Sequence, residues 1–214
     1  MHLVDGSVTV VLVGDWNKFY IKPDWVAGNI YENSEIEIGI EGQDTDFRIS
    51  YRKDKVNIRP SQTKMVFSAA DSQLDTLNLL TKCVNNFLQK AVTPAFSAFG
   101  LNVDYEDQEN ARLADVFDHM EDTELLLDLG YEIGTTQVSR SLTKDGKTLN
   151  VKCTIANSKT TISFNEHHAT PAADQLEITP EMMQTFPQQT DEIVRKFGLS
   201  LIHISEPTRL GMIS

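Results

Sequence analysis

The polar run Asn165-Glu166-His167-His168 holds the side chains best suited to chemistry, and it directly follows an apolar segment. A carboxylate and two imidazoles at the end of a strand can bind a metal ion or transfer protons. Adjacent strand residues point to opposite faces, however, so His167 and His168 would not converge on one ion. A third ligand, His119 or an aspartate, would have to come from elsewhere. We therefore predict no metal site, expect local pairing, and keep Glu166, His167 and His168 as candidate binding residues.

A second candidate group follows the first predicted strand. Val8–Val13 is a continuous run of β-formers, which suits a strand covered on both faces, and Asp15, Trp16 and Asn17 come after it. Loops that leave buried strands often hold binding groups, and tryptophan offers a large amphipathic surface. In the alternative that we favour, Asp15 and Asn17 shape a turn while Trp16 or Trp25 closes the edge of the core.

The elements of the first half would position the Asp15 loop. Glu35–Glu41 alternates isoleucine with glutamate, so the isoleucines should share one face while the glutamates face water. Two further strands follow, around Phe47–Tyr51 and Val56–Ile58. Apolar residues then recur at three- and four-residue steps over Leu74–Ala91, which predicts a helix that ends before Pro94. Leu101, Val103 and Tyr105 alternate with polar residues after it, which predicts a buried strand that follows the helix. We expect the strands to form an antiparallel meander that packs one face on this helix.

The second half has a similar plan and would position the histidine run. Helical patterns over 111–120 and 124–129 precede three strands, and Asp145-Gly146 is a strong signal for a hairpin between the first two. The three strands cover residues 131–142, 149–155 and 160–164. Thr179 and Pro180 then begin a final helix, which Pro187 should kink or split.

Together these patterns predict an α+β protein with an antiparallel sheet of about seven or eight strands and two main packing helices. One unit would span residues 1–198. Its two similar halves, roughly 1–106 and 107–198, both place strands before a packing helix. No sequence repeat relates them.

The last residues of the chain do not resemble a natural protein sequence. Leu199–Arg209 reads LSLIHISEPTR, which resembles the translated transposase adapter used in sequencing libraries, and the remaining residues fit the same frame. This resemblance implies that 199–214 is an artefactual tail and that the native sequence beyond Gly198 is unknown. We exclude the tail from fold and function.

Three short stretches resemble an uncharacterised bacterial family of hypothetical proteins. They are Val11–Asn17 followed by Pro23-Asp24-Trp25, Thr93-Pro94 followed by Ala98–Asn102, and Phe164–His168. The resemblance implies the same plan of strands, helix and strand, and it supplies no activity or catalytic residue. The chain departs from the family pattern at His168, where an aromatic residue is expected.

Composition narrows the classes of partner. The chain has 214 residues and a formal net charge of −12, with 31 acidic against 19 basic residues. This sign argues against nucleic acid or an anionic membrane surface as the main partner, the exception being an acidic protein that imitates DNA. Two cysteines, Cys83 and Cys153, are too few for a disulfide framework and predict free buried thiols. Val8–Val13 is too short for a signal peptide or a membrane span, so we expect a cytoplasmic protein.

Motifs with an established catalytic mechanism are missing from the sequence, including phosphate-binding glycine loops, nucleophile elbows and paired-histidine or paired-cysteine metal motifs. We therefore predict a non-enzymatic interaction or oligomerising module without a cofactor, because the edges of alternating strands need partners. Its partner would be another protein or a second copy, not nucleic acid or a membrane. The alternative is a small-ligand or metal-binding protein, or an enzyme, with its site at the strand-end loops around Asp15 and His167.

Overall fold

The computed structural model describes residues 1–15, 20–42, 48–91, 95–107, 127–132, 134–156, 159–169 and 176–204, which hold one ten-stranded sheet and three helices. The strands are β1 (His2–Leu3), β2 (Val8–Asp15), β3 (Glu37–Glu41), β4 (Arg48–Lys53), β5 (Val56–Pro60), β6 (Lys64–Ala69), β7 (Ala95–Asp107), β8 (Thr135–Lys144), β9 (Lys147–Ala156) and β10 (Lys159–Ala169). The helices are α1 (Pro23–Asn29), α2 (Leu74–Lys90) and α5 (Pro180–Ile204). None of these helices combines the length and the apolar character that crossing a membrane would require.

The α+β class with an antiparallel sheet is confirmed, but the sheet has more strands than the seven or eight predicted. The two missed strands are β1, which has only two residues, and β6. Three consecutive residues at the end of β6 are buried, so its sequence shows no regular alternation of apolar and polar residues. The predicted helix over 111–120 and the first three residues of the one over 124–129 lie outside the described residues.

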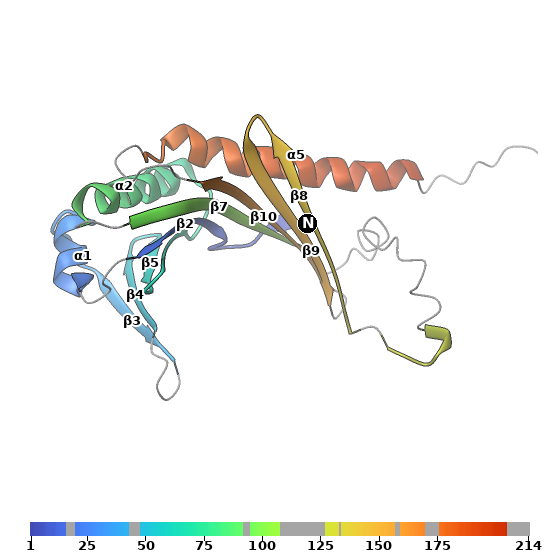
Figure 1. Cartoon of the computed structure of the whole chain (residues 1–214), viewed down its shortest axis with the longest axis horizontal. Coiled ribbons are helices and arrows are strands. Elements are labelled where there is room, and N and C mark those ends of the chain that lie inside the picture. Colours follow the sequence, from blue (N-terminus) through green and yellow to red (C-terminus); the bar gives the residue numbers. More distant parts are fainter. Residues whose placement is uncertain are drawn as a thin grey trace, which may run out of the picture.

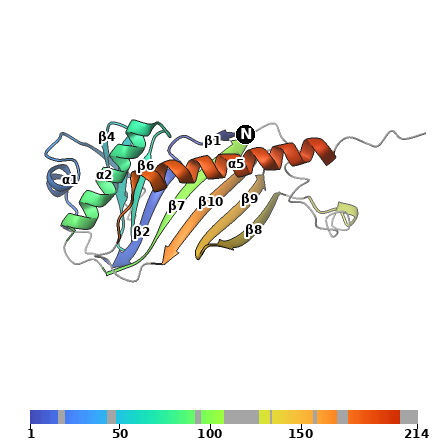
Figure 2. The same cartoon turned by 90° about the horizontal axis from the view of Figure 1, so that it is seen from above.

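The strand order is β3-β4-β5-β6-β2-β7-β10-β9-β8, with β1 paired to one end of β7, and every neighbouring pair is antiparallel (Figures 1 and 2). Each half follows the same path: a first strand (β2 or β7), a meander whose last strand (β6 or β10) returns beside the first, and then a helix (α2 or α5). The pairing of β2 with β7 joins the halves into one sheet.

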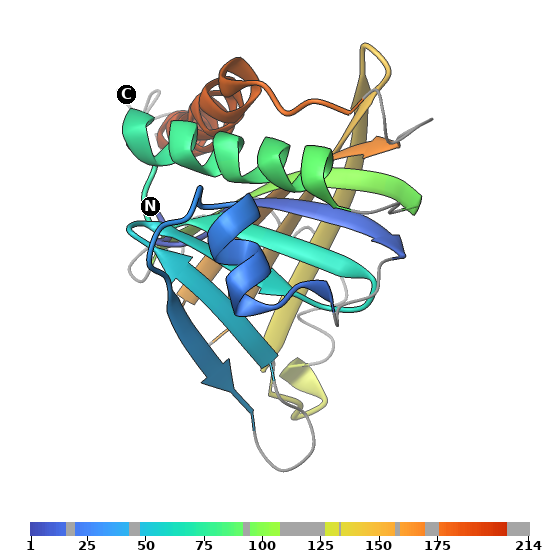
Figure 3. The same cartoon turned by 90° about the vertical axis from the view of Figure 1, so that its left-hand side faces the viewer.

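Helices α2 and α5 pack on one face of the sheet (Figures 2 and 3). The core lies beneath them, and Phe87 of α2 packs edge-on against Phe67 of β6, with ring centroids 5.8 Å apart. Asn85 of α2 ties down the segment before α5, because its amide donates to the carbonyl of Ile178 at 2.8 Å and accepts from the Ile178 N–H at 3.1 Å. No described helix packs on the opposite face, which we call the open face.

Pro187 lies inside α5, which continues unbroken to Ile204, so the predicted split of this helix is wrong. Proline removes one helical N–H and displaces a carbonyl of the preceding turn. Side chains add hydrogen bonds at the proline and the residue before it: the Tyr105 hydroxyl donates to the carbonyl of Pro187 at 3.1 Å, and the Thr190 hydroxyl bonds the carbonyls of Phe186 and Pro187. Burial and hydrogen bonding of this turn therefore hold the helix together.

The predicted packing of the isoleucine strand on α2 is wrong for most of its length. Ile36 contacts the core, but the side chains of Ile38 and Ile40 are 51% and 68% exposed. Ile49, the cross-strand partner of Ile40 on β4, is 41% exposed. The reason is position, since β3 is an edge strand that extends beyond α1 and α2 (Figure 3).

Candidate functional site

The histidine run lies inside a strand. β10 continues to Ala169, so the prediction that it ends at Phe164 is wrong, and Asn165–His168 pairs with β7 on one side and mostly with β9 on the other. His168 is directly opposite Phe99 of β7, and His167 is opposite Gly100. These side chains are therefore held by a ladder of backbone hydrogen bonds and not by a strand-end loop.

Glu166 and His168 share the helix-covered face of β10 and contact each other. Glu166 Oε1 lies 2.7 Å from His168 Nε2, and both side chains are largely buried. The His168 ring stacks on Phe99, with centroids 4.2 Å apart and planes 6° apart. The hydrogen bond to His168, aided by nearby Lys147, lowers the pKa of Glu166 although burial raises it. The pair is thus satisfied within the protein and keeps a carboxylate charged.

His167 points to the other face of the sheet, as strand alternation predicts, and does not join this pair. Within the described ranges, no three His, Cys, Asp or Glu side chains are placed to hold a metal ion together. His119, which we considered as a third ligand, lies outside those ranges.

Asp15 is the exposed last residue of β2, opposite Ala95 of β7. Trp16 and Asn17 lie outside the described residues. Since β2 and β10 are both antiparallel to β7, they run parallel to each other and end at the same side of the sheet. β2 and β10 lie about 10 Å apart across one intervening strand, but His167 is level with Val11 of β2, so Asp15 lies four residues further along the sheet.

A row of polar side chains on the open face was not predicted from the sequence. Asn150 Nδ2 donates to Asn165 Oδ1 at 3.1 Å, and Asn165 Nδ2 donates to Asn102 Oδ1 at 2.7 Å. Asn102 Nδ2 in turn donates to the Thr9 hydroxyl at 3.1 Å. We call these four residues the asparagine row. They come from β9, β10, β7 and β2, so only the strand order and register place them together.

Polar residues continue this row to both edges of the sheet through direct cross-strand pairs. On one side the pair is Asn150 with Ser141 of β8; on the other, the successive partners beyond Thr9 are Ser68, Asn57, Arg52 and Glu37. Asn57 Oδ1 is buried and has no hydrogen-bond partner among the described residues. The row is therefore polar on nine neighbouring strands, and the described residues leave Asn57 Oδ1 without a donor.

A groove of about 470 Å³ opens beside the asparagine row. Its lining residues are Ser139, Arg140, Ser141, Asn150, Val151, Lys152, Ser163 and Asn165. In the part of the chain that the structure describes, these supply hydroxyls, amides and cations and no carboxylate. Small-molecule sites commonly enclose about 300–1,000 Å³, so the groove is large enough for a small polar ligand.

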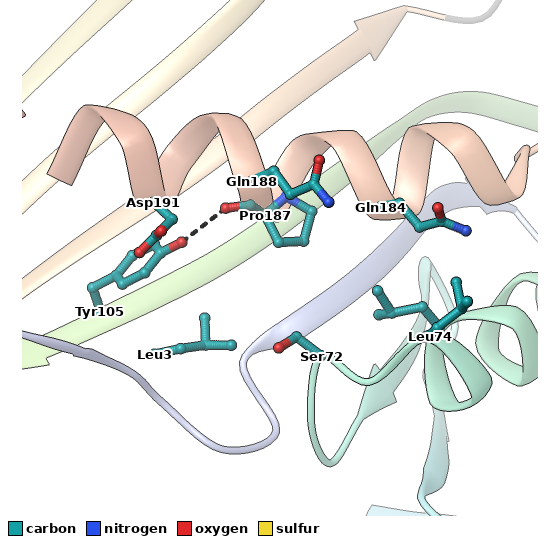
Figure 4. Close-up of a pocket in the computed structure, with 9 residues that line it drawn as sticks. Leu3, Ser72, Leu74, Tyr105, Gln184, Pro187, Gln188 and Asp191 are labelled. Atoms are coloured by element: carbon teal, nitrogen blue, oxygen red, sulfur yellow. Dashed lines mark hydrogen bonds between the residues drawn. The ribbon is translucent and has the colours of Figure 1, made fainter. Parts of the chain in front are cut away.

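A second cavity of about 510 Å³ lies between α2, α5 and β1 (Figure 4). Tyr105 and Asp191 line it, yet the Tyr105 hydroxyl is bonded to Pro187 and Asp191 is paired with Arg195 at 2.8 Å. Burial raises the pKa of Tyr105, which keeps this hydroxyl protonated. The two groups thus serve the packing of α5.

Cys83 and Cys153 are free and buried, as predicted. Burial raises the pKa of Cys83 to about 12 and that of Cys153 to about 11. Since the thiolate is the nucleophile, neither side chain is suited to covalent catalysis at neutral pH.

No protein-family model matches this chain, and no curated protein sequence matches it.

Proposed function

We propose that the protein is a non-enzymatic interaction module that takes an extended segment of a partner protein as an additional strand beside β3. One observation carries the proposal: β3 is an edge strand of the described sheet, and its two central isoleucines are exposed. Edge strands present backbone N–H and C=O groups that a further strand can bind.

The exposed side chains supply an apolar anchor for such a segment. Ile38 and Ile40 lie on one face of β3, and Ile49 adjoins Ile40 on β4. Full burial of one isoleucine side chain contributes about 1.5–3 kcal/mol, so a strand that covered part of this patch would gain binding energy beyond its backbone hydrogen bonds.

Charge selects the kind of partner. Glu37 and Glu41 are exposed on the other face of β3. Two copies paired antiparallel through β3 about Gly39 would place Glu37 opposite Glu41 of the second copy, and like charges in direct opposition are destabilising. A different protein segment, with apolar residues alternating with lysine or arginine, fits better than a second copy.

The polar groups singled out from the sequence also favour a module without catalysis. Glu166 and His168 are paired with each other, and Cys83 is a buried thiol with a raised pKa. Free thiols persist in reducing compartments, so we further propose a cytoplasmic location.

Selection of random nine-residue peptides on the purified chain tests the proposal. We expect enriched peptides to alternate apolar and basic residues, and to lose binding to the Ile38→Lys/Ile40→Lys variant. Leu142→Lys is the matched control, because Leu142 is a similarly exposed apolar residue on the opposite edge strand β8. Enrichment of acidic peptides, or equal binding to the double variant, would exclude strand addition at β3.

Ligand binding at the sheet end that carries Asp15 and His167 is a second candidate, favoured only by the proximity of the ends of β2 and β10. Thermal melts against divalent metals and nucleotides test it. A ligand at a hundred times its Kd should add about 2.7 kcal/mol of stability. The shift should disappear in Asp15→Ala or His167→Ala; a shift that both variants retain would refute this site.

A further inference from the structure

We propose that the groove on the open face binds a phosphorylated sugar, with the phosphate beside Lys152 and the sugar hydroxyls along the asparagine row. This site is separate from the β3 edge and does not depend on the proposed function. Its argument rests on Lys152 and the hydroxyls beside it, the fixed geometry of the asparagines and the sign of the local charge.

The phosphate end consists of three neighbouring side chains. Lys152 of β9 is directly opposite Ser139 of β8 on one side and Ser163 of β10 on the other, so these side chains start about 5 Å apart. Lys152 is exposed, and no carboxylate of the described residues lies within ion-pair distance of it. An ammonium flanked by two hydroxyls presents several donors to one anion.

Local charge differs from the overall charge of the chain. The formal net charge is −12, yet among the described residues no carboxylate lines this groove. The nearest acidic residue across the strands is Asp104, the cross-strand partner of Ser163 on β7. Its repulsion places an anion toward Ser139 and Lys152, the side of the groove near β8.

The sugar end lies two residues further along the strands, at Asn150 of β9 and Ser141 of β8. Asn150 donates its amide N–H to Asn165 and keeps its own Oδ1 as an acceptor, while Ser141 lies directly opposite as a hydroxyl donor and acceptor. Sugar hydroxyls need both kinds of partner. Because the asparagines hold one another, a ligand would not have to order them, which reduces the entropic cost of binding.

Gly100 of β7 is part of this geometry. A Cβ at position 100 would lie 2.7 Å from Asn165 Nδ2, so a larger residue would displace the amide that bonds Asn102. The backbone of β7 thus leaves space for the asparagine row.

A purely structural row of asparagines would not account for two features. A ladder that serves only the sheet needs no groove beside it, and it needs no unpaired lysine within that groove. The buried Asn57 Oδ1 further along the same row also lacks a donor within the described ranges. The open face therefore offers more hydrogen-bonding groups than the protein uses.

Calorimetric titration of the full chain with glucose 6-phosphate, glucose and inorganic phosphate tests the proposal. We expect glucose 6-phosphate to bind more tightly than either of the other probes. Loss of one charge-assisted contact in Lys152→Met should weaken it roughly ten- to hundredfold. Lys144→Met on the same hairpin is the matched control, because Lys144 does not line the groove, and its affinity should equal that of the wild type.

The Asn150→Ala variant supplies an independent test of the sugar end. It should weaken glucose 6-phosphate binding while leaving inorganic phosphate binding unchanged, because it removes a sugar contact and no phosphate contact; unchanged thermal melting shows that loss of its hydrogen bond to Asn165 leaves the fold intact. The proposal is overturned if the wild type binds none of the three probes, if Lys152→Met binds as tightly as the wild type, or if inorganic phosphate matches glucose 6-phosphate.

Discussion

Glu166 is a residue for which the sequence suggests a chemical role, but its contacts in the structure stabilise the fold. A carboxylate beside two histidines suggested metal or proton chemistry, but alternation sends His167 to the other face and leaves Glu166 bonded to His168. The stacked ring of Phe99 covers His168 from the neighbouring strand. The sequence could predict the divergence of the two histidines, because it follows from strand geometry alone. It could not predict the Phe99 contact, which depends on register.

The pH dependence of stability should report this pair. The pKa of Glu166 is lower in the folded state than in the unfolded state, where it is about 4.3. The charged form of Glu166 therefore stabilises the fold above about pH 4.3, and this contribution is lost as pH falls through the folded-state pKa. Glu166→Gln should therefore reduce the free energy of unfolding at pH 7 by about 1 kcal/mol. Urea denaturation from pH 7 to pH 3 should show the difference shrinking below about pH 4.3.

Glu192→Gln is the control for this measurement. Its carboxylate also has a pKa lowered by a lysine, Lys196, but it is exposed on α5. We expect no measurable change, since solvent screens such pairs. A loss for Glu166→Gln that is the same at pH 3 and pH 7 would contradict the assigned role of the charge.

At the level of elements, the predictions are correct where a local sequence signal is enough to determine the structure. The predicted helix 74–91 appears as α2, and the Asp145-Gly146 turn joins β8 to β9 with φ values of 51° and 76°. The exposure of the β3 isoleucines was not predicted, because alternation of apolar and polar residues shows which side chains share a face of the strand. It does not show whether another element covers that face. That depends on where the helices end relative to the edge strand, which is a tertiary property.

The joint between α2 and α5 offers a prediction for element packing. Asn85→Ala removes both hydrogen bonds to the buried backbone of Ile178 and leaves its N–H and C=O without these partners. We expect the free energy of unfolding to fall by about 2 kcal/mol. Urea denaturation measures the loss, with Asn78→Ala, an exposed asparagine on the same helix, as the control. Equal stability of the two variants would show that this joint contributes little.

At the level of the molecule, the sequence suggested two halves with one plan, and the strand order shows the same path in each. The candidate ligand site was beyond sequence reasoning. Thr9, Asn102, Asn150 and Asn165 have no common motif, and two of the three hydrogen bonds join residues in different halves or across a long connection. A shift of one residue in any of these ladders would send an asparagine into the core face.

Truncation tests the proposal that the last residues are an artefactual tail. Val194 is buried in the part of α5 whose side chains are described, and the tail begins five residues later. The chain 1–198 should match the full chain in stability within about 0.5 kcal/mol by urea denaturation. Ending the chain at Gln189 instead should destabilise it by several kcal/mol, because it removes Thr190 and Val194 from the core. A large loss in 1–198 would show that the tail contributes to the fold.

The central strand β7 also constrains the order of events during synthesis. It is thirteen residues long and has β2 on one side and β10 on the other. β2, its partner on one side, precedes it in the chain. β10, its partner on the other side, leaves the ribosome only after β8 and β9 have been synthesised, which takes several seconds at about 5–20 residues per second. Until then the nascent chain carries a long, bare, apolar edge in the middle of its future sheet. That interval is when a chaperone would protect it and when two nascent chains on one message would be most prone to pair with each other.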